Sequence, residues 1–147
     1  MTHTENAIEI AAPASRIFAL AADTARWPEF LPHYRYVRTL REDGDGKTLA
    51  MGAWRDFIPV SWVARQWNDE RTPSIRFHHV RGWTRGMDVE WKFERTAAGT
   101  RVSIVHDLEF AFPVARDFLG KHVVGEFFVR AIAAKTLRCI KALAERA

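Results

Sequence analysis

The longest regular pattern in the chain is a series of β-strand alternations over residues 34–110, followed by a single helical stretch. The clearest strand alternates charged residues with the apolar side chains of Met87, Val89, Trp91 and Phe93. Such alternation is typical of an antiparallel strand with one buried face and one face in water. Consecutive antiparallel strands form a curved meander, and the apolar face of that sheet needs a cover.

Turn and cap signals place the individual elements. Residues 5–11 predict a first strand, and two short helices are expected next, at residues 16–22 and 25–31. Pro13 is acceptable in the first turn of a helix, because an N–H group there has no partner in any case. The six strands that follow are predicted at 34–42, 47–56, 60–68, 74–81, 87–94 and 100–110, separated by turns rich in glycine, aspartate and proline.

From Pro113 onward the chain has helical periodicity, with a stripe formed by Val129, Ile132, Thr136, Ile140 and Leu143. This is the only predicted element long enough to cover the sheet. The order of elements therefore predicts an α+β fold in one domain, residues 1–147. In it, a curved antiparallel sheet of about seven strands wraps around a long C-terminal helix. A cavity remains wherever the facing side chains do not fill the space.

Composition argues against several classes of protein. The longest stretch without Asp, Glu, Lys or Arg is 57–64, whereas a bilayer-spanning helix needs about 20 apolar residues. Acidic Glu5 and Glu9 precede the apolar run at 17–22, so we expect no export signal. The single cysteine, Cys139, allows no internal disulfide and fits a reducing compartment, which favours a cytoplasmic protein. The net charge of +4 is spread along the chain, so no nucleic-acid footprint is expected.

His106 is the most informative polar residue on the predicted sheet. It shares a strand face with Val102, Ile104 and Leu108, so alternation points it into the core or the cavity. An imidazole there can serve as a general base or acid. It can equally be a neutral core histidine that is hydrogen-bonded within the protein, and both interpretations stay open.

The pair His78-His79 does not predict a metal site. Adjacent strand residues point to opposite faces, and no His-x-x-x-His pair or second cysteine supplies further ligands. His79 alternates with Ile75 and Phe77, however, and can therefore face the cavity. We expect no metal and one cavity-facing histidine from this pair.

Other side chains could contact a ligand at the wall or the entrance of a cavity. Trp62 and Trp91 can flank a flat ligand by stacking, although aromatic residues also make good core. Arg85 lies in the Arg- and Gly-rich segment 81–86, which we interpret as a loop at the pocket entrance. Its charge would steer an anionic ligand toward the opening.

Three segments carry a resemblance to a known family: residues 22–34, which include Trp-Pro-Glu-Phe-Leu-Pro-His-Tyr, residues 62–66 and residues 99–108. Together with Leu137, Ile140 and Lys141 of the last helix, they resemble the START-like helix-grip (SRPBCC) superfamily, and within it the polyketide cyclase/aromatases. The resemblance covers about residues 5 to 146. The Trp-Pro-Glu-Phe-Leu-Pro segment is also similar to coenzyme-Q-binding members, which carry lipid.

The resemblance implies a pocket that cyclises and dehydrates a poly-β-keto chain without a metal or redox cofactor. Tyr34 stands where the cyclases have a pocket-lining tyrosine, and His106 where some have a histidine facing the cavity. Gln66 falls where the family commonly has an arginine. Thr136 falls on the helix where members present Asp or Asn, although its hydroxyl can also bond back to its own helix.

The expected function is binding of a hydrophobic or polyketide-like small molecule. If the protein is an enzyme, we expect it to act on that molecule as a cyclase/aromatase, with His106 as the base or acid. Tyr34 and Gln66 would then donate hydrogen bonds to substrate oxygens, and Thr136 would stand on the helix side of the pocket. The alternative is a non-catalytic lipid or quinone carrier. A module whose loops bind another protein is a third alternative, and the sequence is compatible with a homodimer.

Overall fold

The computed structural model describes residues 2–82, 84–108 and 115–146, the last range with side chains from Val129 onward. The chain begins with one strand and three short helical segments: β1 (Thr2–Ile10), α1 (Ala14–Ala22), η1 (Thr24–Arg26) and α2 (Trp27–Phe30). Six strands follow: β2 (Tyr34–Asp43), β3 (Gly46–Arg55), β4 (Ile58–Asp69), β5 (Ser74–Gly82), β6 (Asp88–Thr96) and β7 (Gly99–Leu108). The last element is α3 (Ala115–Glu145).

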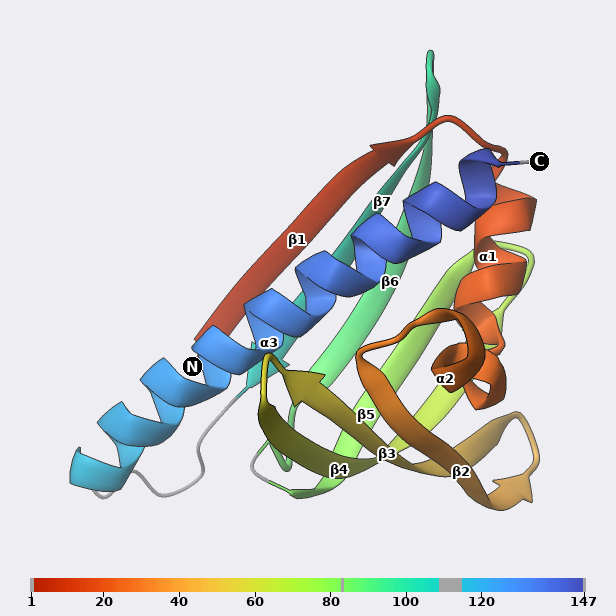
Figure 1. Ribbon diagram of the computed structural model, residues 1–147. Coiled ribbons are helices and arrows are strands. Elements are labelled where there is room, and N and C mark those ends of the chain that lie inside the picture. Colours follow the sequence, from red (N-terminus) through yellow and green to blue (C-terminus); the bar gives the residue numbers. More distant parts are fainter. Residues whose placement is uncertain (1, 83, 109–114, 147) are drawn as a thin grey trace.

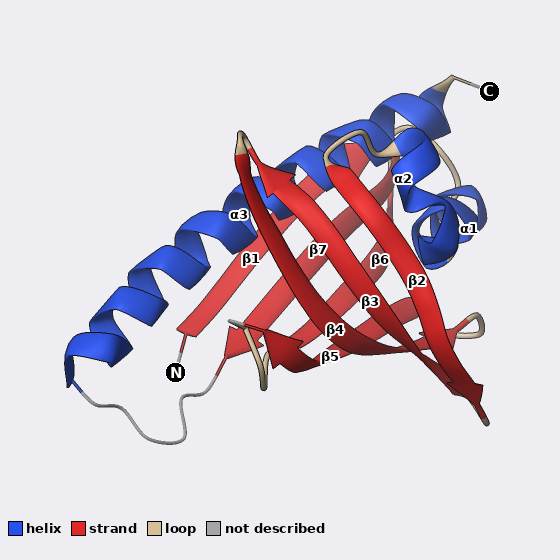
Figure 2. Cartoon of the chain, turned by 60° about the horizontal axis from the view of Figure 1, so that its bottom comes forward, coloured by secondary structure: helices blue, strands red, loops and turns tan. Residues whose placement is uncertain are grey.

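The seven strands form one antiparallel sheet in the order β1-β7-β6-β5-β4-β3-β2. Six strands are thus a simple meander, and the first strand pairs with the last. Helix α3 crosses one face of the sheet, and α1 and α2 lie beside its C-terminal half (Figure 1). A view of the molecule turned about the horizontal axis shows that the sheet curves around the helix (Figure 2). The predicted α+β architecture is confirmed.

Local differences from the prediction lie at the ends of the elements. Pro13 precedes α1 as its N-cap residue and is not inside its first turn. The predicted helix at 25–31 is two pieces, η1 and α2, with Pro28 in the first turn of α2. The predicted end of the last strand, residues 109–110, lies outside the described residues.

A bulge at the start of β2 separates Tyr34 from Tyr36. Tyr34 pairs with Ala53 while Tyr36 pairs with Gly52, so the register shifts by one residue between them. Tyr34 is buried, whereas the Tyr36 ring lies on the outer face, directly over Gly52. Residues two apart on a regular strand share a face, so it is the bulge that separates the two tyrosines. A side chain at Gly52 would place its Cβ 2.3 Å from the Tyr36 ring, which explains the glycine.

The core lies between the concave face of the sheet and α3. The predicted alternation of β6 is confirmed, because Val89 and Trp91 are buried there and their charged neighbours are not. The helix contributes the buried side chains of Ala133, Thr136, Leu137, Ile140 and Ala144. No helix within the described part of the chain is long and apolar enough to cross a bilayer.

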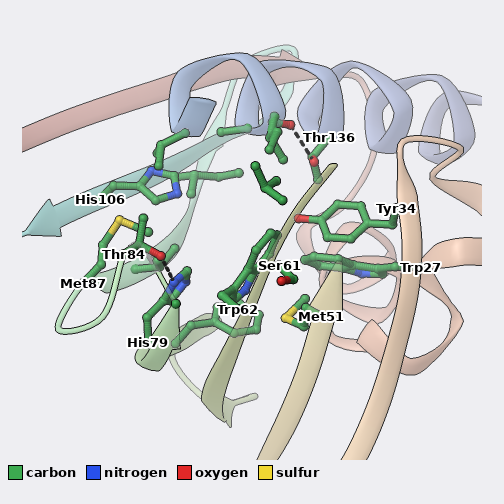
Figure 3. Close-up of a pocket in the computed structure, with 18 of the residues that line it drawn as sticks. Trp27, Tyr34, Met51, Ser61, Trp62, His79, Thr84, Met87, His106 and Thr136 are labelled. Carbon is green, nitrogen blue, oxygen red and sulfur yellow. Dashed lines mark hydrogen bonds between the residues drawn. The ribbon is translucent and has the colours of Figure 1, made fainter. Parts of the chain in front are cut away.

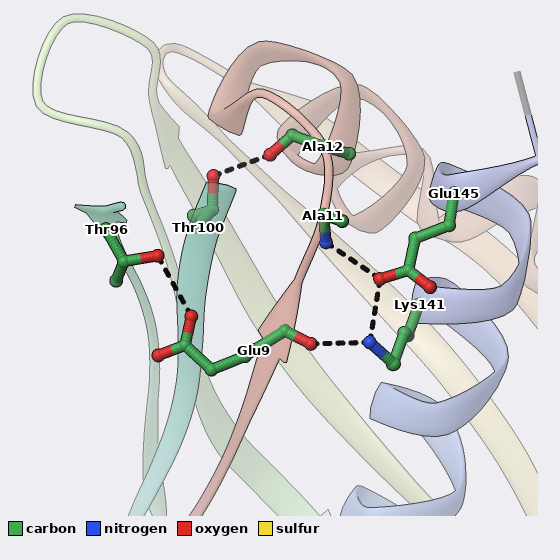
Figure 4. Close-up of polar contacts among 7 residues, drawn as sticks. All are labelled: Glu9, Ala11, Ala12, Thr96, Thr100, Lys141 and Glu145. Atoms are coloured by element: carbon green, nitrogen blue, oxygen red, sulfur yellow. Dashed lines mark hydrogen bonds and ion pairs between the residues drawn. The ribbon is translucent and has the colours of Figure 1, made fainter. Parts of the chain in front are cut away.

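Polar contacts fasten the C-terminal end of α3 to the end of β1 (Figure 4). The Lys141 ammonium donates to the Glu9 carbonyl at 2.8 Å, and the Glu145 carboxylate accepts from the Ala11 N–H at 2.7 Å. This N–H, together with Lys141, holds the pKa of Glu145 below its usual value. The Thr100 hydroxyl donates to the Ala12 carbonyl at 2.8 Å and fixes the same turn. The helix is thus held at this end of the sheet.

Candidate functional site

A pocket of about 370 Å³ lies between the concave face of the sheet and α3. This volume is within the usual range of small-molecule sites. Side chains from α2, from β2 through β7 and from α3 point into it from several sides (Figure 3). Most of the wall is apolar, and its polar side chains, apart from the indole N–H groups of three tryptophans, are those of Tyr34, Ser61, His79, Thr84, His106 and Thr136.

His106 forms part of the wall on β7, opposite Val89 of β6. Its Nδ1 is buried and has no hydrogen-bond partner among the described residues. Burial lowers the pKa of His106 from 6.5 to about 4, although the nearby Asp107 carboxylate favours the charged form. The ring is therefore neutral at neutral pH, and one of its two nitrogens is an acceptor that can take a proton.

His79 lies on the same side of the pocket and is held by two neighbours. Its Nδ1 is 2.6 Å from the Thr84 hydroxyl, and its ring stacks on Trp62 with centroids 5.6 Å apart and planes within 4°. Burial, together with the positive forms of His106 and His78, lowers the pKa of His79 from 6.5 to about 3. Thr84 is thus a site residue that we did not predict. The sequence feature that could have indicated it is its place in segment 81–86, which we interpreted as a loop at the pocket entrance.

Tyr34 lies on the opposite side, in a group of aromatic rings. The centre of the Tyr34 ring lies 4.9 Å from that of Trp27 and 6.1 Å from that of Trp62, and both pairs are edge to face. Burial raises the pKa of Tyr34 well above its usual value, an effect that hydrogen bonding by the Thr136 hydroxyl opposes. The phenol is therefore protonated at any physiological pH. Trp91 stands 6.0 Å from Trp27 and extends this aromatic wall.

Thr136 reaches the pocket from α3 and, besides its contact with Tyr34, is held by two hydrogen bonds. Its hydroxyl donates to the Ile132 carbonyl at 2.8 Å, the back-bond that we considered from the sequence. Since a hydroxyl has one proton, the His33 Nε2, also 2.8 Å away, must donate to the Thr136 oxygen. Burial, together with the Lys135 charge, lowers the pKa of His33 to about 4. We did not predict His33 as a site residue, although it stands in the segment that carries the family resemblance.

Gln66 lies outside the pocket wall. Its side chain is on the concave face, but α1 and η1 cover that end of the sheet. The Oε1 accepts from the Thr24 hydroxyl at 2.6 Å, while Nε2 donates to the Ala22 carbonyl at 3.1 Å and to Asn68 at 2.8 Å. These bonds hold α1 and η1 against β4. In this structure Gln66 thus makes contacts within the fold and is not among the side chains of the pocket wall.

Arg85 is also absent from the pocket wall. It is exposed in the loop between β5 and β6, next to Thr84, which does line the pocket. Four exposed residues of the wall, Ile58, Pro59, Ser61 and Gly82, mark the opening. Arg85 therefore lies on the loop that borders this opening, and a contact between Arg85 and a ligand stays a prediction.

The arrangement suits a flat, largely apolar molecule that carries a few oxygen atoms. Aromatic side chains on one side of the pocket can stack on such a molecule. Polar groups stand at separate places around it, with histidines on one side and Tyr34 on the other. Among the described residues, no group of three or more His, Cys, Asp or Glu side chains is placed to hold a metal ion.

Comparisons with known proteins agree on one family. A family model described as polyketide cyclase / dehydrase and lipid transport matches residues 10–129. A Streptomyces halstedii protein named as a polyketide cyclase is 32% identical over 100 residues, which are 66% of this chain and 92% of that protein. The granaticin polyketide synthase bifunctional cyclase/dehydratase of Streptomyces violaceoruber is 31% identical over 144 residues, covering 97% of this chain and 44% of that enzyme.

The fold is likewise similar to that of the Zhui aromatase/cyclase of Streptomyces sp. R1128, with a TM-score of 0.84 over 98% of this chain and 93% of that one. The two sequences are 19% identical, so this likeness concerns the fold. The resemblance inferred from the sequence is confirmed by the family model and the curated relatives together. The chain belongs to the polyketide cyclase / dehydrase and lipid transport family.

Proposed function

We propose that this protein cyclises a poly-β-keto chain inside the pocket, by intramolecular aldol addition followed by loss of water. The observation that carries the proposal is His106, a neutral imidazole in an apolar wall with a buried nitrogen that no described residue engages. A buried polar atom without a partner is costly in a folded protein and is commonly explained by a functional role. Family membership adds independent support.

The chemistry requires one group that takes up a proton and returns it. A methylene between two ketones is acidic, and removal of one of its protons leaves an enolate. The enolate carbon bonds to a ketone carbon further along the chain, whose oxygen becomes an alkoxide and takes the proton back. Loss of that hydroxyl together with a neighbouring C–H proton then releases water and leaves a carbon–carbon double bond.

His106 has the properties for this proton transfer. It is neutral throughout the neutral pH range and so has a lone pair free to accept the methylene proton, although the burial that lowers its pKa also makes it a weaker base than a free imidazole. The imidazolium formed is a strong acid in this environment, because its pKa is about 4, and it returns the proton readily to an alkoxide. Across the pocket, the protonated phenol of Tyr34 is placed to donate a hydrogen bond to a substrate oxygen on which charge develops.

The remaining wall would fold and orient the chain. Trp27, Trp62 and Trp91 offer ring faces and edges against which a planar product can pack. His79 and Thr84 form a hydrogen-bonded pair that can orient a further ketone. Holding the reacting carbons close together lowers the activation barrier, because the entropy that a free chain loses in the transition state is already lost on binding.

The test uses a reactive poly-β-keto thioester and follows its conversion to the cyclised aromatic product. We expect the protein to accelerate product formation and His106→Gln to lose at least about a hundredfold of that acceleration, the usual contribution of a positioned acid–base group. His78→Gln is the matched control, since His78 lies on the outer face of β5 and pairs with Asp88. Equal rates for the protein and for H106Q would refute the proposed role of His106.

A non-catalytic carrier of a lipid or quinone is the second candidate, favoured by the mostly apolar wall of the pocket. Native mass spectrometry of the protein purified from a cellular host separates the two. A retained fatty acid, phospholipid or quinone, with no acceleration of cyclisation, supports the carrier. An empty protein that accelerates cyclisation supports the enzyme.

A further inference from the structure

Large apolar side chains that reach solvent gather at one end of the sheet. Of the five exposed ones in the described part of the chain, three stand together at the β3–β4 turn, namely Trp54, Phe57 and Ile58. Val80 lies near the end of β5, level with Val63 of β4, and Leu40 stands apart on β2. Phe57 is 84% exposed and occupies the short turn between β3 and β4. A cluster of this kind marks a surface that binds something.

This cluster adjoins the mouth of the pocket. Ile58 belongs to both, because it is exposed and also lines the pocket. Gly82, at the end of β5, and Thr84, in the loop that follows, line the pocket two and four residues beyond Val80. The β3–β4 turn itself lies close to α3, which forms the roof of the pocket (Figures 1 and 2). Whatever covers Phe57 and Ile58 therefore lies over the opening.

Cationic side chains surround the same end. Arg81 and Arg85 are exposed at the end of β5 and in the loop after it. The Arg35 guanidinium lies 5.0 Å from the centre of the Trp54 ring. Exposed Lys135, on α3, borders an outer hollow that Trp54 and Phe57 also line.

Two exposed acidic side chains at this end have partners within the protein, and one of them, Asp88 at the start of β6, lies 2.7 Å from the His78 ring. The other, Asp56, in the β3–β4 turn, pairs with the guanidinium of Arg55. The described side chains around the opening therefore combine protruding apolar groups with an excess of positive charge.

We propose that this end of the molecule docks on an anionic lipid surface. Phe57 and Ile58 insert at the boundary between headgroups and acyl chains, and the surrounding arginines and Lys135 contact the headgroups. The exposed apolar groups stand on a narrow turn and on strand ends around an opening, a shape that enters a soft interface more readily than it fits a flat protein surface. Docking here would let a hydrophobic ligand pass between bilayer and pocket without crossing water.

The proposal is tested by sedimentation of the protein with vesicles of phosphatidylcholine alone or mixed with phosphatidylserine. We expect binding to the mixed vesicles that weakens as salt is added, because headgroup attraction is screened. Phe57→Ala should lower the partition coefficient by about tenfold or more, from loss of an inserted aromatic ring. The double variant R81A/R85A should lower it severalfold on mixed vesicles and leave the weak binding to pure phosphatidylcholine unchanged.

Two matched controls come from the same chain. Leu40→Ala removes another exposed apolar side chain, and Arg71→Ala removes an exposed charge in the β4–β5 turn, at the other end of β4 and β5. Both should bind vesicles as the unchanged protein does. Equal binding to the two vesicle types, or the same loss in L40A as in F57A, would overturn the proposal.

Other occupants of this surface give different results. Absence of vesicle binding, with a concentration-dependent dimer that Phe57→Ala dissociates, would show that a second copy covers it. Absence of vesicle binding, with Phe57-dependent capture of a purified acidic protein, would show a protein partner. Either result overturns the lipid proposal, and neither depends on whether the pocket catalyses cyclisation. Urea unfolding of F57A shows whether the variant remains folded.

Discussion

The stability of this protein falls steeply below neutral pH, because three histidines are held neutral in the fold: the buried His33 and His79, and the half-buried His106. His33 and His106 have their pKa values lowered from 6.5 to about 4, and His79 to about 3. In the unfolded chain all three return to the ordinary value. The unfolded state therefore binds more protons than the folded state as the pH falls below about 6.5, and stability is lost across that window. The loss levels off only below the pKa values of the folded protein.

The magnitude follows from the size of these shifts. Each histidine costs about 2 kcal/mol of unfolding free energy between pH 7.5 and pH 5, at 1.36 kcal/mol per pH unit below its ordinary pKa. The three together remove about 6 kcal/mol, which is comparable to the whole stability of a typical domain. We therefore expect the protein to be folded at pH 7.5 and close to its unfolding transition at pH 5.

Urea unfolding followed by tryptophan fluorescence at a series of pH values measures this loss. His106→Gln should remove about a third of the pH dependence between pH 7.5 and 5, since it deletes one of the three groups. His78→Gln should keep all of it, because that side chain is on the solvent-facing side of β5 and 42% exposed. A free energy of unfolding that changes by less than about 1 kcal/mol over this range would refute the reasoning.

Three further predictions concern stability and binding. Gly52→Ala should cost about 1–3 kcal/mol in urea unfolding, because the new Cβ collides with the Tyr36 ring, and an unchanged midpoint would contradict the described packing. Thr136→Val should cost about 1–3 kcal/mol by leaving the His33 Nε2–H unpaired, whereas T136S should restore it, and equal losses would rule that bond out. Ala133→Leu fills the pocket from α3, so calorimetry should show weaker binding of 1-naphthol; unchanged affinity would place the ligand elsewhere.

The alternation of buried and exposed residues along the strands was enough to predict most of the fold and the position of His106. The strand predicted at 87–94 lies at Asp88–Thr96, and the face shared by Val102, Ile104 and Leu108 is buried, with His106 in the pocket wall. Such predictions succeed because alternation depends only on the local geometry of a strand. The antiparallel meander then follows from chain order, as does the cover that α3 provides.

The missed features depend on contacts between distant segments. The bulge that sends Tyr36 to the outer face has no signature beyond a slip in alternation, because β3 supplies its partner, Gly52. Gln66 does occupy the inner face, but which part of that face α1 and η1 cover is decided by packing. His33 lies in a short connection without periodicity, so only its bond to Thr136 reveals its place beside the site.

The central claim is that a polyketide-like molecule lies in this pocket with an oxygen or an acidic carbon beside His106. A crystal structure of the protein with a bicyclic phenolic ketone, a stable stand-in for a cyclised product, tests it most directly. We expect the rings to lie among Trp27, Trp62 and Trp91, with one polar atom of the ligand within hydrogen-bond distance of His106. A ligand seated elsewhere, or one in the pocket with only apolar atoms toward His106, would contradict the proposed chemistry.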